Sequence, residues 1–267
     1  MKNLSFIKMQ SVGNDYVFID ERSNGRVDNP SGIARLISER RFSVGSDGLV
    51  LITRSNDGDV GMRIFNADGS EGMTCGNALR CVGAYLNKNG EGNEFNVVTA
   101  SGRRRVWLEK EMVFAEMGCA KYRDGNLPPC GIFLMPFSDD EYLFTSVSVG
   151  NPHAVAFVTS LDFDAKGVAG ELAKSGIYPH GVNVEFAKIK DGVAKARVVE
   201  RGSGETFGCG SGACAIAAAM KLHGLLRGGR AVVRYKGGSL FVDVDGDNSL
   251  ILSGEVRMVF KGVLEID

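Results

Sequence analysis

Two stretches of the chain repeat one pattern: Glu71-Gly72-Met73-Thr74-Cys75-Gly76-Asn77 and Glu205-Thr206-Phe207-Gly208-Cys209-Gly210-Ser211. In each, a glutamate comes four residues before a Cys-Gly pair. Two other segments recur in the same order at nearly the same separation, Val12-Gly13-Asn14 as Val149-Gly150-Asn151, and Val97-Val98 with Gly102 as Val232-Val233 with Gly237. A fixed separation between several segment pairs indicates an internal repeat. The sequence therefore predicts two similar domains, which divide near Gly118.

The local patterns around these repeats predict a mixed α/β protein. Short β-branched and aromatic runs, such as 16–19, 49–52 and 240–242, lie between turn signals and predict many short strands. Helical periodicity is found at 33–41, 78–86, 168–174 and 211–226. The run 213–220 is apolar on every side, which is typical of a helix buried all round.

Composition narrows the function classes. The chain has 267 residues, and its 31 Lys+Arg against 32 Asp+Glu give a net charge of −1, with no global field to attract nucleic acid or an anionic membrane. No apolar run approaches the length of a membrane span, and polar and charged residues are spread throughout the segment 1–20. We therefore expect a soluble cytoplasmic protein that acts on a small molecule.

The cysteine and histidine content argues against a disulfide framework or a structural metal site. The six cysteines include no CxxC pair, and the histidines His153, His180 and His223 are scattered without zinc-ligand spacing. The cysteines are thus expected to be free thiols, either packed in the core or chemically reactive.

The two repeated cysteines are the candidates for reactive thiols. Each precedes a helical pattern, so its sulfur is expected at a helix N-terminus, where free N–H groups and the helix dipole stabilise an anion and bind carboxylates. We expect this position to lower the thiol pKa. A pair of similar domains places its site at their interface, where Cys75 and Cys209 would face each other. Inverting a stereocentre needs a base on one face and an acid on the other, which a thiolate and a thiol can supply.

Longer motifs in both halves add to this interpretation: Gly13-Asn14-Asp15, Arg63-Ile64-Phe65-Asn66-Ala67-Asp68-Gly69-Ser70-Glu71, Gly150-Asn151-Pro152-His153, Glu200-Arg201-Gly202-Ser203-Gly204-Glu205-Thr206 and Cys209-Gly210-Ser211-Gly212-Ala213-Cys214. Together with Cys75-Gly76-Asn77 they resemble the diaminopimelate epimerase family over essentially the full length. The resemblance implies two β-barrel-like domains, each wrapped around a central helix, with residues 1–118 and about 256–267 in the first and 119–255 in the second. It also implies a homodimer that interconverts LL- and meso-diaminopimelate for lysine and peptidoglycan precursor synthesis.

The resemblance assigns roles by position and implies no cofactor and no metal. Cys75 and Cys209 would be catalytic, and Arg201 suits a distal carboxylate because its planar fork can pair with two oxygens. The other implied substrate contacts are the side chains of Asn14, Asn66, Asn151, Asn183 and Glu200 and the main-chain N–H groups of Gly76, Asn77, Gly210 and Ser211. This chain has Gly48 where some family members carry glutamine, and Ala78 where they carry glycine.

Several alternatives stay open. His153 is either a satisfied polar residue near the site or a donor that lines it, and Asn183 is either a contact or a turn residue. Another amino acid could be the substrate, a thiol-redox protein would also use reactive cysteines, and Gly208-x-Gly210-x-Gly212 weakly resembles a nucleotide loop. The remaining cysteines are expected to be incidental or buried packing: Cys81, Cys119, Cys130 and Cys214.

Overall fold

The computed structural model describes residues 2–125, 127–128 and 131–266, which form two compact units. The first unit contains Met1–Glu116 with Gly254–Asp267, and the second contains Met117–Ser253. The predicted division near Gly118 falls within strand β8 (Met112–Cys119). Cys130 lies outside the described residues.

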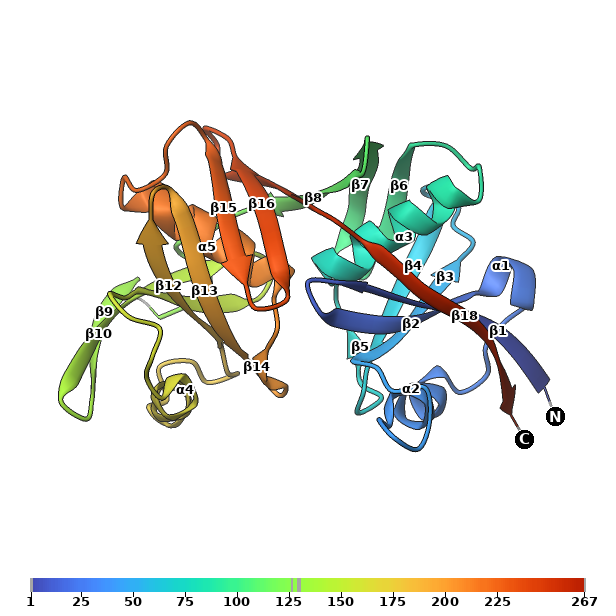
Figure 1. The fold of residues 1–267 in the computed structure, drawn as a ribbon, viewed down its shortest axis with the longest axis horizontal. Coiled ribbons are helices and arrows are strands. Elements are labelled where there is room, and N and C mark those ends of the chain that lie inside the picture. The colour runs from blue at the N-terminus through green and yellow to red at the C-terminus, as the bar shows by residue number, and fades with distance from the viewer. Residues whose placement is uncertain (1, 126, 129–130, 267) are drawn as a thin grey trace. The chain divides into compact units, whose positions relative to one another are not determined.

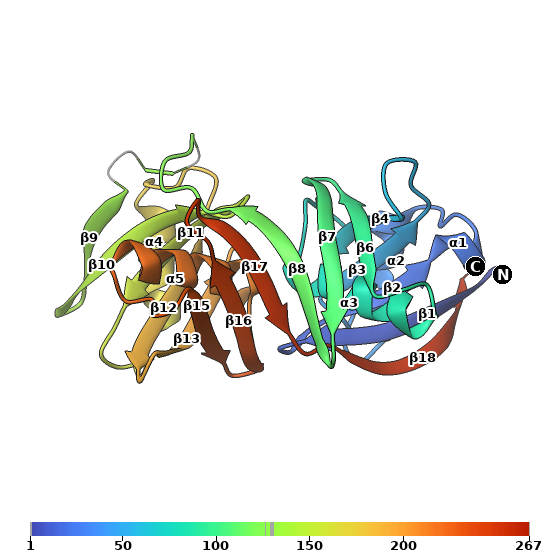
Figure 2. The same cartoon turned by 90° about the horizontal axis from the view of Figure 1, so that it is seen from above.

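The first unit is a curved sheet around one helix, α3 (Gly76–Lys88), with two helices on its outer side, α1 (Glu21–Asn24) and α2 (Pro30–Ser38) (Figure 1). Besides β8, its strands are β1 (Lys2–Ser11), β2 (Asn14–Asp20), β3 (Gly48–Thr53), β4 (Val60–Asn66), β5 (Glu71–Gly72), β6 (Glu94–Thr99), β7 (Gly102–Glu109) and β18 (Arg257–Ile266). The antiparallel pairing of β1 with β18 brings the two ends of the chain side by side (Figure 2).

The second unit repeats this plan around α5 (Gly210–Leu222), with α4 (Ala165–Lys174) outside. Its strands are β9 (Ile132–Phe137), β10 (Asp140–Ser148), β11 (Pro152–Phe157), β12 (Asn183–Lys190), β13 (Val193–Glu200), β14 (Gly204–Thr206), β15 (Arg230–Tyr235), β16 (Gly238–Val244) and β17 (Ser249–Gly254).

The strand pairings of the two units match step for step. In the first, β2–β3 and β4–β6 are parallel and the pairs β1–β2, β3–β4, β4–β5 and β6–β7 are antiparallel. In the second, β11–β12 and β13–β15 are parallel, and the corresponding pairs are antiparallel. The duplicated pairing agrees with the internal repeat, and the α/β class predicted from the sequence is confirmed.

Both central helices are buried because their side chains fill the inside of the sheet. In α3, the residues Leu79, Val82 and Leu86 are fully buried within one apolar cluster. In α5 every residue from Ala213 to Met220 is buried, as its apolar sequence predicts. The parallel crossovers need connections that return along the sheet, and α2 and α4 provide two of them.

Helix ends differ from the sequence prediction for local reasons. The predicted helix 211–226 stops at Leu222, because Gly224 adopts a left-handed φ of 67° and the next two N–H groups turn back to the Met220 carbonyl oxygen. The helix predicted at 33–41 instead begins at Pro30, where Asn29 caps the N–H of Gly32 at 3.1 Å. No helix in the described ranges is long and apolar enough to cross a membrane.

Candidate active site in each half

Cys75 occupies the N-cap of α3, with extended backbone angles φ −130° and ψ 119°. Its carbonyl oxygen accepts the first bond of the helix, from the N–H of Leu79 at 2.8 Å. The N–H groups of Gly76 and Asn77 lie in the first turn, where an α-helix offers them no internal acceptor. The Cys75 side chain is half-buried, and N–H groups at this position of a helix are suited to bind an anion.

Asn14 connects this cysteine to its surroundings. Its Oδ1 accepts from the Cys75 thiol at 3.5 Å and from Asn77 Nδ2 at 3.2 Å. Asn77 is itself held by Arg80, whose Nη2 donates to Asn77 Oδ1 at 2.7 Å. The structure thus brings Asn14, Cys75 and Asn77 together in the first half.

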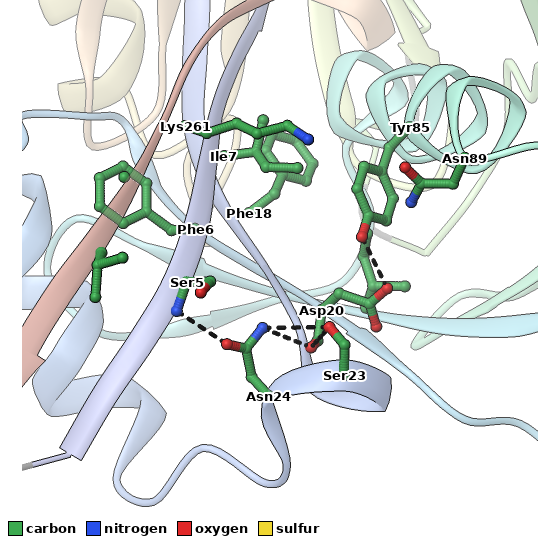
Figure 3. A pocket seen from close by; sticks show the side chains of 13 residues that line it. Ser5, Phe6, Ile7, Phe18, Asp20, Ser23, Asn24, Tyr85, Asn89 and Lys261 are labelled. Atoms are coloured by element: carbon green, nitrogen blue, oxygen red, sulfur yellow. Dashed lines mark hydrogen bonds between the residues drawn. The ribbon is translucent and has the colours of Figure 1, made fainter.

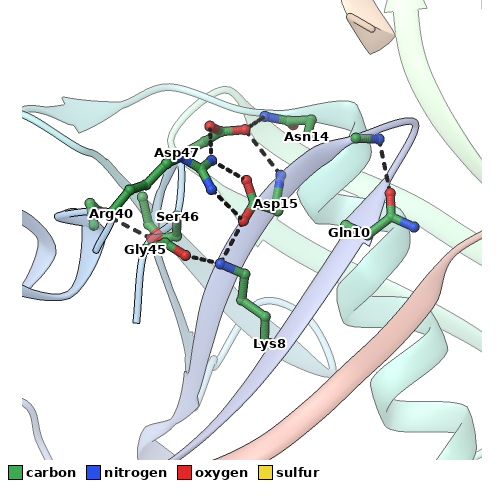
Figure 4. A network of polar contacts seen from close by, with 11 residues as sticks. Lys8, Gln10, Asn14, Asp15, Arg40, Gly45, Ser46 and Asp47 are labelled. Carbon is green, nitrogen blue, oxygen red and sulfur yellow. Dashed lines mark hydrogen bonds and ion pairs between the residues drawn. The ribbon is translucent and has the colours of Figure 1, made fainter. Parts of the chain in front are cut away.

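A network of charges holds Asn14 in place (Figure 4). Asp47 Oδ2 accepts from Asn14 Nδ2 at 2.8 Å, and Arg40 Nη2 bridges Asp47 and Asp15 at 3.0 and 2.6 Å. Lys8 pairs with Asp15 at 2.5 Å and also donates to the Gly45 carbonyl oxygen. Burial alone would raise the pKa of Asp15, but Arg40 and Lys8 outweigh it and hold that pKa below its ordinary value. Asp47 was not identified from the sequence, since only the fold places it beside Asn14.

Asn66 and Gly48 face each other across β3 and β4. Asn66 is exposed at the end of β4, and its Nδ2 donates to Ser70 Oγ at 2.9 Å. Gly48 has no room for a side chain, because a β-carbon there would collide with the carbonyl oxygen of Phe65 and stand 3.0 Å from the Tyr16 ring. The glutamine that some family members carry at this position therefore does not fit this backbone.

Cys209 occupies the N-cap of α5 with backbone angles almost identical to those of Cys75, φ −127° and ψ 125°. Its sulfur accepts from the N–H of Gly212 and lies near Ser211 Oγ, each at 3.4 Å. Its side chain is 6% exposed, so Cys209 is more enclosed than Cys75.

The expectation that the helix N-terminus lowers the thiol pKa is wrong for Cys209. Burial raises its pKa well above the ordinary value, and the negative charges of Glu200 and Glu185 add to the effect. The contacts with Ser211 and the Gly212 N–H oppose the shift but do not reverse it. With its pKa raised in this way, the Cys209 side chain is a protonated thiol that is suited to donate a proton.

Glu200 lies beside the Cys209 thiol at the end of β13. Its Oε1 accepts from Thr206 Oγ1 at 2.5 Å, and its carboxyl group also contacts Cys209. Burial raises the pKa of Glu200, the hydrogen bonds from Thr206 and Cys209 lower it, and the charge of Glu185 raises it further. The net shift is upward, so Glu200 is a weaker acid than usual.

His153 contacts a predicted site residue and an unexpected one. Its Nδ1 lies 2.7 Å from Glu185 Oε1, with both side chains fully buried, and its Nε2 lies 3.1 Å from Asn151 Oδ1. Glu185 was missed in the sequence. The sequence did contain a signal for it. In the run 182–187, which is apolar except for Asn183 and Glu185, an acidic residue at a buried position indicates a specific partner.

Asn183 and Arg201 are joined through the main chain. The side chain of Asn183 accepts from the N–H of Arg201 at 3.0 Å and donates to the Pro152 carbonyl oxygen at 3.2 Å. The Arg201 guanidinium is exposed and uses Nη1 to donate to the His180 carbonyl oxygen at 2.7 Å. Asn183 therefore fixes the turn that carries Arg201. Among the described residues the Arg201 guanidinium has no other hydrogen-bond acceptor, which leaves its remaining donors for a ligand.

The glutamate of each repeated motif has a structural partner. Glu71 accepts two hydrogen bonds from Arg63, at 2.7 and 2.9 Å, and Glu205 accepts two from Arg197, at 2.6 and 3.1 Å. The same bidentate pair thus fixes the short strand before each cysteine.

The other described cysteines are either buried in a helix or exposed. Cys81 and Cys214 are buried in the central helices, and burial raises the pKa of Cys81 to about 12. Cys119 is exposed. Within the described ranges, no group of three or more His, Cys, Asp or Glu side chains is placed to hold a metal ion.

A separate cavity of about 420 Å³ lies in the first unit between β1, β2 and β18 (Figure 3). Its polar end is formed by Asp20, which accepts from Tyr85 at 3.0 Å, and by Asn24. None of the predicted site residues lines this cavity.

Comparison with solved structures shows which proteins share this fold. A hydroxyproline epimerase from Agrobacterium vitis, crystallised with bound trans-4-hydroxy-L-proline, aligns with a TM-score of 0.75 at 14% identity over 98% of this chain and 92% of that one. A predicted epimerase from Pseudomonas aeruginosa aligns with a TM-score of 0.72 at 17% identity over 99% and 100%. At this identity the likeness concerns the two-domain fold.

Sequence comparison is more specific. The family model for diaminopimelate epimerase matches residues 6–122 and 145–259. The chain is 36% identical to a diaminopimelate epimerase of Methanococcus maripaludis strain C6 over 280 residues, covering 98% of this chain and 100% of the relative. It is 39% identical to one of Desulfovibrio desulfuricans over 283 residues, covering 97% of each. The chain therefore belongs to the diaminopimelate epimerase family.

Proposed function

We propose that this protein interconverts LL- and meso-diaminopimelate without a cofactor, using Cys75 and Cys209 as the two acid/base groups. The observation that carries the proposal is the repeated half-site: in each unit a cysteine is the N-cap of the buried central helix, with nearly the same backbone angles. Two copies of one thiol site are what a reaction needs when a proton leaves one face of a carbon and returns to the other.

The proposed chemistry follows from what each half-site contains. One cysteine, as thiolate, takes the α-proton, and the electron pair of the broken C–H bond spreads into the α-carboxylate. The other cysteine, as thiol, delivers its proton to the opposite face, so that the two sulfurs exchange protonation states. The free N–H groups at the starts of α3 and α5 offset the negative charge that develops on the carboxylate.

The neighbouring side chains supply recognition. The amides of Asn14 and Asn151 offer donors and acceptors for the carboxylate and ammonium of the reacting end, with Asn66, Asn183 and Glu200 as further proposed contacts. Arg201 is proposed to bind the distal carboxylate, which only a dicarboxylic amino acid provides. Support for this role comes from its exposed guanidinium, which has one hydrogen bond to the main chain at 2.7 Å.

A substrate panel tests the proposal. The purified protein is incubated with LL- and meso-diaminopimelate and with monocarboxylic amino acids, and the stereoisomers are separated by chiral chromatography. Epimerisation of diaminopimelate alone is expected. Racemisation of a monocarboxylic amino acid with no turnover of diaminopimelate would show that the proposed substrate is wrong. Thiol-dependent peroxide reduction with no epimerisation would show that the protein is a thiol-redox protein and not an epimerase.

A solvent isotope experiment tests the two-base mechanism separately. In heavy water the thiol hydrogens exchange for deuterium. One thiolate then removes the α-proton of the substrate, and the other thiol delivers a deuteron to the opposite face. At early conversion, deuterium should therefore appear in the product while recovered substrate keeps its hydrogen. Equal labelling of substrate and product would favour a single base.

We also propose that the protein works in the cytoplasm as a homodimer. Support for the homodimer comes from β18, where the large apolar side chains of Val259, Phe260 and Val263 are about half exposed, at 51%, 47% and 60%. A second copy of the chain could cover them. Light scattering of the wild type and of a Val263→Glu variant tests this, and a wild-type monomer at micromolar concentration would contradict it.

A further inference from the structure

A chain of hydrogen bonds runs inside the second unit from Glu185 through His153 to Asn151. Glu185 lies on β12 and His153 on the adjacent parallel strand β11. The links are 2.7 Å between Glu185 Oε1 and His153 Nδ1 and 3.1 Å between His153 Nε2 and Asn151 Oδ1. Glu185 and His153 are fully buried, whereas Asn151 is half-buried. The chain therefore leads from the core to a proposed substrate contact.

The protons of this chain decide which way the Asn151 amide faces. If His153 carries a hydrogen on Nε2, that hydrogen is donated to Asn151 Oδ1 and the NH₂ group points away. If Nε2 carries only its lone pair, Asn151 must turn over and donate to it, and its oxygen then points away. The first arrangement presents donors to a ligand, and the second presents an acceptor that would repel a carboxylate.

Burial selects between these arrangements. A neutral Glu185–His153 pair has two protons, one shared between Glu185 and Nδ1 and one on Nε2. Removing the second proton would leave a net negative charge in a site with no exposure to water. Besides His153, the titratable groups of the described residues that interact with Glu185 include Glu200, Cys209 and Tyr235, which add negative charge or none. Their presence disfavours another anion at this buried pair, which favours the arrangement with a hydrogen on Nε2.

The free end of Asn151 agrees with this assignment. Within the part of the chain that the structure describes, Asn151 Nδ2 makes no hydrogen bond to protein, while Oδ1 contacts His153 Nε2.

The equivalent asparagine of the first unit has different partners. There Val50 stands at the strand position equivalent to Glu185, and Asn14 Nδ2 is bound to Asp47, so Asn14 turns its oxygen to the Cys75 thiol.

We propose that Glu185 is a positioning residue that keeps a proton on His153 Nε2 and thereby turns the Asn151 NH₂ group toward the substrate carboxylate. The part that concerns the substrate rests on the proposed function, whereas the protonation of His153 does not. In this role Glu185 acts on Asn151 through His153, in addition to the effect of its charge on the pKa of Cys209.

The first test reads the histidine directly. Nitrogen-15 NMR of histidine-labelled enzyme without substrate reports which ring nitrogens of His153 carry hydrogen, with a His153→Gln variant to assign the signals. A protonated Nε2 is expected in the wild type throughout neutral pH. It is also expected in Glu185→Gln, whose amide can donate to Nδ1 and leave the hydrogen on Nε2. An unprotonated Nε2 in the wild type would overturn the proposal, even if no variant folds.

The second test separates positioning from packing by kinetics. Glu185→Leu keeps the volume but removes the hydrogen bond, so the KM for diaminopimelate should rise about tenfold or more, as expected for one lost hydrogen bond to a charged group. Glu185→Gln should stay within roughly threefold of the wild-type KM, because it retains the bond. Glu171→Gln, which breaks an exposed ion pair on α4, is the control and should leave KM unchanged.

The outcomes distinguish this proposal from the proposed function. An enzyme that shows no epimerisation refutes the function, while the NMR result still decides the protonation of His153. Equal KM values for Glu185→Leu and the wild type, or a fall in kcat alone, would contradict the positioning role. A KM close to that of the wild type in Glu185→Gln, together with a raised KM in Glu185→Leu, supports the positioning role.

Discussion

The carbonyl oxygen of Phe65 fills the space that a side chain at Gly48 would need. The two residues lie on the paired strands β4 and β3, and Gly48 has a φ of 157° that L side chains rarely adopt. Gly48→Ala should therefore destabilise the protein by about 1–3 kcal/mol, because the strands must separate to admit one methyl group. Gly48→Gln should be at least as costly. Urea unfolding of each variant measures the effect.

Gly170 provides the matched control for this substitution. It lies in α4 with open space around its α-carbon, so Gly170→Ala should stabilise the protein by about 0.4–1 kcal/mol. If Gly48→Ala unfolded at the same urea concentration as the wild type, the strand contact would be less rigid than the structure indicates, and a glutamine at this position would be compatible with this backbone.

Serine at either of the proposed catalytic positions should remove activity without harming the fold. Cys75→Ser and Cys209→Ser each replace a thiol by a much weaker acid, and loss of one acid/base partner should reduce kcat by roughly 10²–10⁴-fold. Serine is a favoured N-cap residue, so α3 and α5 should be as stable as before. Circular dichroism melting and the epimerisation rate are measured on the same samples.

Cys119→Ser is the control because its side chain is exposed and distant in the sequence from both motifs. It should retain wild-type turnover. A Cys75→Ser or Cys209→Ser variant with near-normal kcat would show that the corresponding thiol is dispensable.

The repeated motifs predicted the organisation of the protein because they mark equivalent positions of a duplicated chain. Their glutamates, cysteines and glycines could be read directly, and the buried character of α5 followed from its uninterrupted apolar run. Partners from distant parts of the sequence could not be read in this way. Asp47 meets Asn14 through the β2–β3 crossover, and Glu185 meets His153 through the β11–β12 crossover.

The thiol pKa shows the same limit in energetic terms. The helix N-terminus at Cys209 was visible in the sequence and favours the thiolate. Burial and the charges of Glu200 on β13 and Glu185 on β12 oppose it, and these depend on how the sheet packs around α5. Tertiary packing thus has a larger effect on the Cys209 pKa than the helix N-terminus has. The local sequence pattern alone therefore predicted the wrong direction for the pKa shift.

Removal of the Glu200 charge should make Cys209 more reactive. After burial, the negative charge of Glu200 is the largest cause of the raised pKa of Cys209. Glu200→Gln should therefore lower that pKa and increase the thiolate fraction at a given pH. The rate of Cys209 alkylation by iodoacetamide should rise roughly three- to tenfold at mildly alkaline pH. Mass spectrometry of the peptide that contains Cys209 follows the rate without interference from the other cysteines.

Glu205→Gln is the matched control for this labelling experiment. Glu205 lies closer to Cys209 in sequence, but its carboxylate is paired with Arg197. Its removal should change the alkylation rate little. Equal rates in Glu200→Gln and the wild type would mean that burial alone sets the reactivity of Cys209.

The Asp15 network should make stability depend on pH in the acid range. The pKa of Asp15 is lower in the folded protein than its ordinary value of about 3.9, because Arg40 and Lys8 stabilise the carboxylate more than burial destabilises it. The resulting stabilisation is fully present above the unfolded pKa and is lost as the pH falls through the folded one. Asp15→Asn should therefore unfold more easily than the wild type at neutral pH, and the difference should shrink below about pH 4. Urea unfolding from neutral to acid pH measures it, and a difference that stayed constant across that range would show that Asp15 stabilises the fold through packing and not through its charge.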